Sequence, residues 1–280
     1  MSIEDFESSV LSLELDGHVA TLWLDRPEAL NAMGRAFWED LPLAVAALNA
    51  DPRVRVIVLA AKGKHFCAGL DLKEMGPELL SPASASDQRS TATRNQERYQ
   101  AILKLQAAVS SLANTDKPVI AAVHGSCIGG GVDLIAACDI RLSSADAMYS
   151  VREARIAIVA DLGSLQRLRS IIGAGHLAEL ALSAKDIDAT RAAEIHLVND
   201  ALGDAEAVYQ RAVSLAQEIA ANSPVAVQGT KAVLRANDGR SVAEGLEFVA
   251  AWNSLYLESH DLQEAITAYF EKRPPNFSGS

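Results

Sequence analysis

Three short segments of almost uninterrupted apolar residues constrain the fold of this chain more than any other feature. They are residues 54–61, 119–123 and 140–142. Such segments are typical of strands that are buried on both faces of a sheet. Helical patterns lie between them, at residues 96–112 and 131–138. This alternation predicts an α/β fold in which helices cover a parallel sheet.

A hairpin and a helix are expected before the first of these strands. Apolar residues alternate over 11–15, and Asp16-Gly17 is a typical hairpin turn before a second strand at 19–24. An amphipathic helix is expected over 35–49. Pro42 predicts a kink or a break in it, because proline cannot donate the helical hydrogen bond.

The second half of the chain predicts one helix after another. The expected helices are 165–172, 176–183, 189–195, 205–221, 225–236, 242–258 and 262–271. Small polar residues are concentrated at 81–93 and predict a loop there.

Composition limits the classes of partner. The 280 residues include 25 basic and 36 acidic side chains, which gives a net charge of −11. Such a surface repels phosphate backbones and anionic lipids, so neither nucleic acid nor a membrane is expected as a partner. Three cysteines without metal-site spacing, an acidic N-terminal segment and no membrane-length apolar run predict a cytoplasmic protein.

Two glycine-containing segments are candidate ligand sites. Residues 65–72 follow the first buried strand, and residues 124–133 lead from the second strand through three consecutive glycines into a helix. Free N–H groups at a helix start attract negative charge, and glycine lets a ligand approach the backbone. A tight turn with close helix packing explains the same glycines, and neither segment matches a phosphate-loop motif.

Three carboxylates are the other candidates, and each has a structural explanation too. Asp133 would favour the positive end of its helix, Glu153 would pair with neighbouring arginines, and Asp161 would cap a helix. Asp161, however, lies in an apolar run. Burial there would raise the pKa of its carboxyl, as proton transfer requires.

These features together resemble the crotonase (enoyl-CoA hydratase/isomerase) superfamily. The resemblance covers about residues 11–271 and is strongest for its Δ3,5-Δ2,4-dienoyl-CoA isomerases. The segments that carry it are residues 31–38, 65–72, 122–135, 149–168 and 223–231. It implies a crotonase-type ββα spiral core with the active site over residues 1–200. A C-terminal helical region, residues 201–280, is implied to build trimers that often pair into hexamers.

The resemblance also implies how the substrate would be bound. The backbone N–H groups of Leu70 and Gly130 would form an oxyanion hole for the carbonyl of an acyl-CoA thioester. The residues implied to contact the substrate and its coenzyme A arm are Ala68, Gly69, Leu70, Asp71, Leu72 and Gly131. Coenzyme A belongs to the substrate, so neither a separate cofactor nor a metal is expected.

The carboxylates carry the implied chemistry. Glu153 matches the superfamily carboxylate at the α-carbon, and Asp133 matches the second hydratase carboxylate but is one methylene shorter. Asp161 stands where ordinary hydratases carry glycine and the dienoyl-CoA isomerases carry aspartate. The expected reaction moves a proton between C2, served by Glu153, and C6, served by Asp161, and so converts 3,5-dienoyl-CoA to 2,4-dienoyl-CoA.

Two other functions compete with this one. A 2-enoyl-CoA hydratase of fatty acid β-oxidation would use Asp133 and Glu153 to activate water, and it would leave Asp161 without a role. An RNA-binding homologue would need a basic surface, which the net charge of −11 disfavours.

Overall fold

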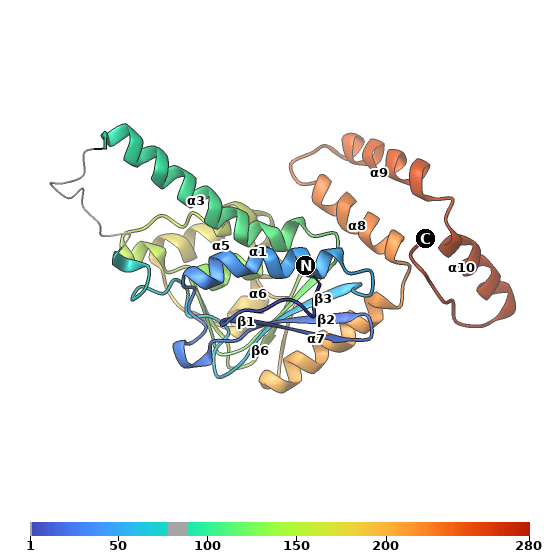
Figure 1. Ribbon diagram of the computed structural model, residues 1–280, viewed down its shortest axis with the longest axis horizontal. Helices are drawn as coiled ribbons and strands as arrows, with labels where there is room; N and C mark the ends of the chain where they lie inside the picture. Colours follow the sequence, from blue (N-terminus) through green and yellow to red (C-terminus); the bar gives the residue numbers. More distant parts are fainter. Residues whose placement is uncertain (1, 78–88) are drawn as a thin grey trace.

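A six-stranded sheet lies at the centre of the molecule (Figure 1), in a computed structural model that describes residues 2–77 and 89–280. The strand order is β1-β2-β3-β4-β6-β9; β1 and β2 pair antiparallel, and all other neighbours pair parallel. The strands are β1 (Leu11–Asp16), β2 (Val19–Leu24), β3 (Val56–Ala61), β4 (Val119–Val123), β6 (Ile140–Ser144) and β9 (Asp200–Leu202). The predicted hairpin and buried parallel strands are therefore confirmed.

A smaller sheet and several helices complete the described chain. The small sheet has the order β5-β7-β8, with β5 (Ser126–Ile128), β7 (Met148–Ser150) and β8 (Ile187–Asp188). The helices are α1 (Arg35–Ala50), α3 (Thr91–Asn114), α4 (Gly130–Ala136), α5 (Ser164–Ser183), α6 (Ala189–Glu194), α7 (Ala205–Ala220), α8 (Pro224–Ala236), α9 (Val242–Tyr256) and α10 (His260–Glu271). Two short 3₁₀ helices are η1 (Pro27–Ala29) and η2 (Glu153–Ile156).

Strand β3 is apolar throughout because helices cover both of its faces. Ile57 and Leu59 pack into the core on the side of α1 and α3, whereas Val56 and Val58 pack against α7 on the other face. All four side chains are fully buried. A strand between two helical layers has no solvent-facing side, so its sequence cannot alternate between apolar and polar residues.

The second half of the chain divides between the sheet and an outlying region. Helix α7 packs on the sheet through Val208, Ala212 and Ala216, although it follows the division expected after residue 200. Helices α8, α9 and α10 extend beyond one end of the sheet (Figure 1). The division into residues 1–200 and 201–280 stays a prediction.

Three helices differ in detail from the pattern expected from the sequence. Helix α1 continues through Pro42 without ending there. The helices expected at 165–172 and 176–183 are the two parts of α5, which has a non-helical residue at Gly173 (φ 80°). Of the loop expected at 81–93, residues 81–88 lie outside the described residues, and Thr91 already begins α3. Within the described part of the chain, no helix is both long and apolar enough to cross a membrane.

Candidate active site

The two glycine-containing segments lie against each other and are joined by backbone hydrogen bonds. The N–H of Cys67 donates to the carbonyl of Ser126, and the N–H of Ile128 donates to the carbonyl of Cys67, both at 2.9 Å. A Cβ added to Gly69 would lie 2.9 Å from the carbonyl oxygen of Ile128 and 3.7 Å from the nitrogen of Gly130. The first segment thus runs beside the start of α4.

Backbone geometry leaves the two predicted oxyanion donors free to meet a ligand. Met33 donates to the carbonyl of Gly69 at 2.8 Å and accepts from the N–H of Asp71 at 3.1 Å. In this parallel pairing the N–H of Leu70, between them, points away from Met33. Gly130 is the first residue of α4, so its N–H precedes the first intrahelical hydrogen bond.

Asp71 holds the turn that follows Leu70. Its carboxylate accepts from Arg26 at 2.8 Å and from the backbone N–H groups of Lys73 at 3.0 Å and Glu74 at 3.2 Å. Burial opposes ionisation of the Asp71 carboxyl, but these donors outweigh it and lower its pKa. The side chain therefore stabilises the loop, and its expected contact with coenzyme A stays a prediction.

Asp133 is buried and caps a helix other than its own. One carboxylate oxygen accepts from the N–H of Ser164, the first residue of α5, at 2.5 Å. The other oxygen has no partner among the described residues. Burial raises the pKa of Asp133 to about 7, and the nearby charge of Glu153 adds to this rise. Asp133 can therefore carry a proton near neutral pH.

Glu153 begins η2 and is not held in an ion pair within the described chain. Arg152 pairs with Asp186 instead. One carboxylate oxygen of Glu153 is buried without a partner, and the other would lie 3.3 Å from a Cβ added to Gly129. Burial raises the pKa of Glu153, and the charge of Asp161 raises it further.

Asp161 lies three residues before α5, in a segment that is neither helix nor strand. Its backbone carbonyl accepts from Gln106 of α3 at 2.6 Å. The residue at the N-cap of α5 is Gly163, and it is Asp133 that binds the N–H of Ser164, so Asp161 is not the cap. Burial raises the pKa of the Asp161 carboxyl, in the direction expected from its apolar surroundings.

The three carboxylates interact through Glu153, whose charge acts on Asp133 and which itself responds to Asp161. Five buried side-chain polar atoms have no hydrogen-bond partner within the described chain, and three of them belong here: Asp133 Oδ2, Glu153 Oε2 and Ser164 Oγ. Buried polar atoms in native proteins are normally paired, so unpaired ones indicate a place for water or a ligand.

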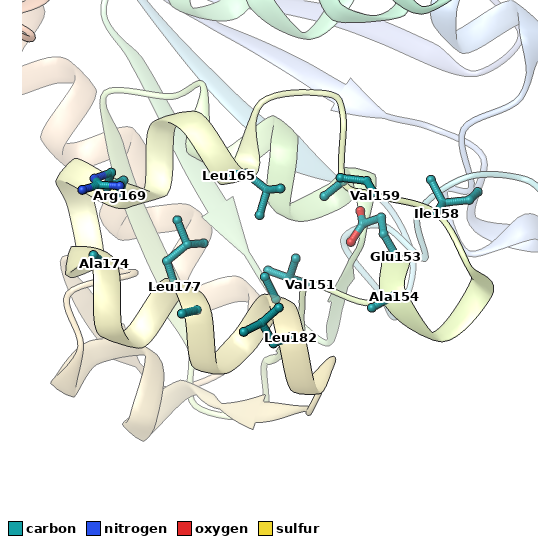
Figure 2. A pocket seen from close by; sticks show the side chains of 13 residues that line it. Val151, Glu153, Ala154, Ile158, Val159, Leu165, Arg169, Ala174, Leu177 and Leu182 are labelled. Atoms are coloured by element: carbon teal, nitrogen blue, oxygen red, sulfur yellow. The ribbon is translucent and has the colours of Figure 1, made fainter.

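An apolar pocket of about 400 Å³ opens beside Glu153. It lies between η2 and the two parts of α5, and Figure 2 shows the Glu153 carboxylate directed into it beside Val159, with Leu165 and Val151 nearby. The other lining residues are Ala154, Ile158, Ala160, Arg169, Ala174, Leu177, Ala178, Ala181 and Leu182. This pocket was not predicted from the sequence; the helical spacing of the small residues Ala174, Ala178 and Ala181 is a signal that could have indicated it.

Residues 14–280 match the family model described as enoyl-CoA hydratase/isomerase. The chain belongs to this family. It is 42% identical over 279 residues to the peroxisomal Delta(3,5)-Delta(2,4)-dienoyl-CoA isomerase of Arabidopsis thaliana, covering 99% of each chain. It is 39% identical to the mitochondrial enzyme of that name from Dictyostelium discoideum, covering 99% of this chain and 93% of the relative.

Solved structures of this family share the fold. The enoyl-CoA hydratase of Bacillus anthracis superposes with a TM-score of 0.86 at 27% identity, over 97% of this chain and 100% of that one. A putative enoyl-CoA hydratase from Streptomyces coelicolor gives a TM-score of 0.86 at 29% identity, over 98% and 96% of the two chains. The predicted crotonase-type fold, with its C-terminal helices, is confirmed.

The predicted cytoplasmic location is wrong when set against these relatives, whose names place them in peroxisomes or mitochondria. The error has a physical reason. Unpaired cysteines and an acidic composition fit any reducing compartment, so they carry no information about which compartment it is.

Proposed function

We propose that this family member is a Δ3,5-Δ2,4-dienoyl-CoA isomerase. The observation that carries the proposal is the pair Glu153 and Asp161, two partly buried carboxyls on neighbouring segments whose pKa values are both raised. A double-bond shift needs one group that takes a proton and a second that gives one. The names of the Arabidopsis and Dictyostelium relatives agree with this reaction.

The reaction begins at C2 of the 3,5-dienoyl thioester. The carbonyl and the diene both acidify the C2 proton, and Glu153 accepts it. The electron pair spreads over an extended trienolate whose negative charge rests largely on the thioester oxygen. The N–H groups of Leu70 and Gly130 stabilise that oxygen, by about 3–4 kcal/mol for each donor.

The reaction ends at C6, where Asp161 donates a proton and leaves the conjugated 2,4-diene. Glu153 therefore starts ionised and Asp161 starts protonated, and the two exchange roles in the reverse direction. Asp133, with a pKa of about 7, holds a proton or a water beside Glu153 and limits the negative charge in the site.

The surfaces on either side of these groups suit the two ends of the substrate. The apolar pocket beside Glu153 would receive the acyl chain, since its lining is almost entirely aliphatic. The coenzyme A arm would lie along the first glycine-containing segment. The contacts proposed for it are Ala68, Gly69, Leu70, Asp71 and Leu72 on that segment and Gly131 on the second segment.

Hydration of a 2-enoyl-CoA is the second candidate, because Asp133 and Glu153 alone would serve it and solved relatives carry the name enoyl-CoA hydratase. Purified protein should be given 3,5-dienoyl-CoA and 2-enoyl-CoA in separate assays. Isomerisation extends conjugation and hydration removes it, so ultraviolet absorbance changes in opposite directions. We expect the faster rate with 3,5-dienoyl-CoA; a faster hydration rate would contradict the proposal.

We also infer that the chain assembles into trimers, alone or paired into hexamers. The outlying helices α8–α10 expose large apolar side chains that nothing in the described chain covers. They include Leu234, Val242, Leu246, Leu255, Tyr269 and Phe270, of which Tyr269 is 79% and Phe270 77% exposed. Exposed apolar surface of this extent marks an interface. Sedimentation at micromolar concentration should give three or six times 29.7 kDa, and a stable monomer would contradict the inference.

A further inference from the structure

Gln106 is a half-buried residue of α3 whose side chain reaches the segment that carries Asp161. Its Nε2 donates to the backbone carbonyl of Asp161 at 2.6 Å, across 55 positions of sequence. Asp161 belongs to no helix or strand, so no regular backbone pairing fixes its main chain. The amide of Gln106 therefore sets the position of that main chain.

The residue after Asp161 is linked to the same helix through Arg167 of α5. Arg167 donates to the carbonyl of Leu162 at 3.2 Å and to the hydroxyl of Ser110 at 2.8 Å. Ser110 lies one helical turn after Gln106 on α3. Gly163 leaves room for this guanidinium, since a Cβ there would overlap Nη1 of Arg167. Helix α3 thus braces Asp161 directly through Gln106 and Leu162 indirectly through Arg167.

Glu153 does not share this brace. It begins η2, which packs against α5, and within the described residues Glu153 makes no hydrogen bond with α3. Its unpaired carboxylate oxygen and its neighbour Gly129 lie on the side of the second glycine-containing segment. A change at Gln106 should therefore move Asp161 and leave Glu153 in place.

We propose that Gln106 is a positioning residue for proton transfer at C6, which it serves by fixing Asp161 without touching the substrate. The inference rests on the proposed function. A carboxyl that transfers a proton must lie within hydrogen-bond reach of its carbon, and a displacement of about 1 Å can slow a reaction roughly 100-fold. The side chain of Gln106 has no other hydrogen-bond partner in the described chain, so its amide serves this contact alone.

The test compares Gln106→Met, which keeps the length of the side chain but removes the donor, with Gln100→Met on an exposed part of the same helix. We expect Gln106→Met to lower kcat for 3,5-dienoyl-CoA by roughly 10- to 100-fold, with KM changed less than about twofold. Gln100→Met should match the parent in both constants. Gln106→Leu also lacks the donor and provides a second variant if the first folds poorly.

A deuterium experiment separates positioning from general loss of structure. In D₂O, the trienolate of Gln106→Met should return to substrate more often, because its protonation at C6 is slow. Unreacted 3,5-dienoyl-CoA should then gain deuterium at C2 faster, relative to product formation, than with the parent.

Two results would overturn the inference. One is a kcat for both Gln106 variants equal to that of Gln100→Met, and the other is a parallel fall in C2 exchange and product formation. A parent protein that does not isomerise 3,5-dienoyl-CoA would instead overturn the proposed function, and this inference with it.

Discussion

The two halves of the candidate site are held by different kinds of hydrogen bond. Around Leu70 and Gly130, the backbone of one segment binds the backbone of the other, as in the paired bonds of Cys67. Around Asp161, the backbone is held by side chains, those of Gln106 and Arg167. The geometry around Leu70 and Gly130 therefore depends on the backbone conformation, whereas the geometry around Asp161 depends on the identity of a few side chains.

This difference suggests how one family can contain both hydratases and isomerases. Backbone donors persist through most substitutions, so the binding of a thioester oxygen survives while other parts of the site change. A single side-chain substitution can move a carboxyl, and this changes which carbon receives the proton. If the two halves are as separate as their bonding implies, a substitution in one should leave the other unchanged.

The largest expected effect is a loss of isomerisation activity in Asp161→Asn, with acyl-CoA binding retained. This substitution keeps the size of the side chain but removes the carboxyl that we propose as the proton donor at C6. General acid–base groups contribute about 10²–10⁴-fold, so isomerisation of 3,5-dienoyl-CoA should fall by that factor while acyl-CoA binding persists. Steady-state kinetics and a ligand-dependent rise in Tm would measure the two. Isomerisation at the parent rate would remove Asp161 from the mechanism.

The next effect concerns Asp133, which belongs to both halves because it lies in α4 and binds α5. Its pKa is raised from 3.8 to about 7 on folding, so between these values the folded chain binds a proton that the unfolded chain has released. Stability is therefore lost as pH rises towards 7. In Asp133→Asn this loss is absent.

The measurement is the difference in free energy of unfolding between Asp133→Asn and the parent, from urea titrations at several pH values. This difference should shift by about 3 kcal/mol in favour of the variant between pH 5 and pH 8. Titrating groups that do not interact with Asp133 contribute equally to both proteins. A difference independent of pH would mean that Asp133 is ionised throughout.

Much of the fold could be predicted because its signals are local. The buried strands β3 and β4 are apolar on both faces, and Asp16-Gly17 marks the hairpin turn. The short strands of the second sheet escaped prediction because β8 has only two residues and draws its stability from pairing with β7. Of the kink or break predicted at Pro42, the break does not occur, because tertiary packing maintains α1 through this residue.

For the site, the sequence predicted only what the resemblance to the crotonase superfamily implied. The family is confirmed, and the expected isomerase reaction agrees with the names of the relatives. The roles of Asp133, Glu153 and Asp161 stay predictions. Gln106 could not have been found from sequence, since it contacts Asp161 from 55 residues away and a lone glutamine in a helix carries no signal.

The smallest expected effect tests the backbone-held half, through Gly69→Ala. Gly69 has φ of 87°, and the new Cβ would lie 2.9 Å from the carbonyl oxygen of Ile128. Gly239→Ala is the matched control, because Gly239 has φ of 73° but no atom within 4 Å of an added Cβ. Backbone strain alone costs about 1–3 kcal/mol in each variant.

Only Gly69→Ala should also push the two glycine-containing segments apart. Its free energy of unfolding should therefore fall further than that of Gly239→Ala. Isomerisation and C2 deuterium exchange should decline together in it, because both pass through the same oxyanion, whereas Asp161→Asn affects C6 alone. Equal losses of stability in both variants, with full activity, would show that the segments can separate without disturbing the Leu70 and Gly130 donors.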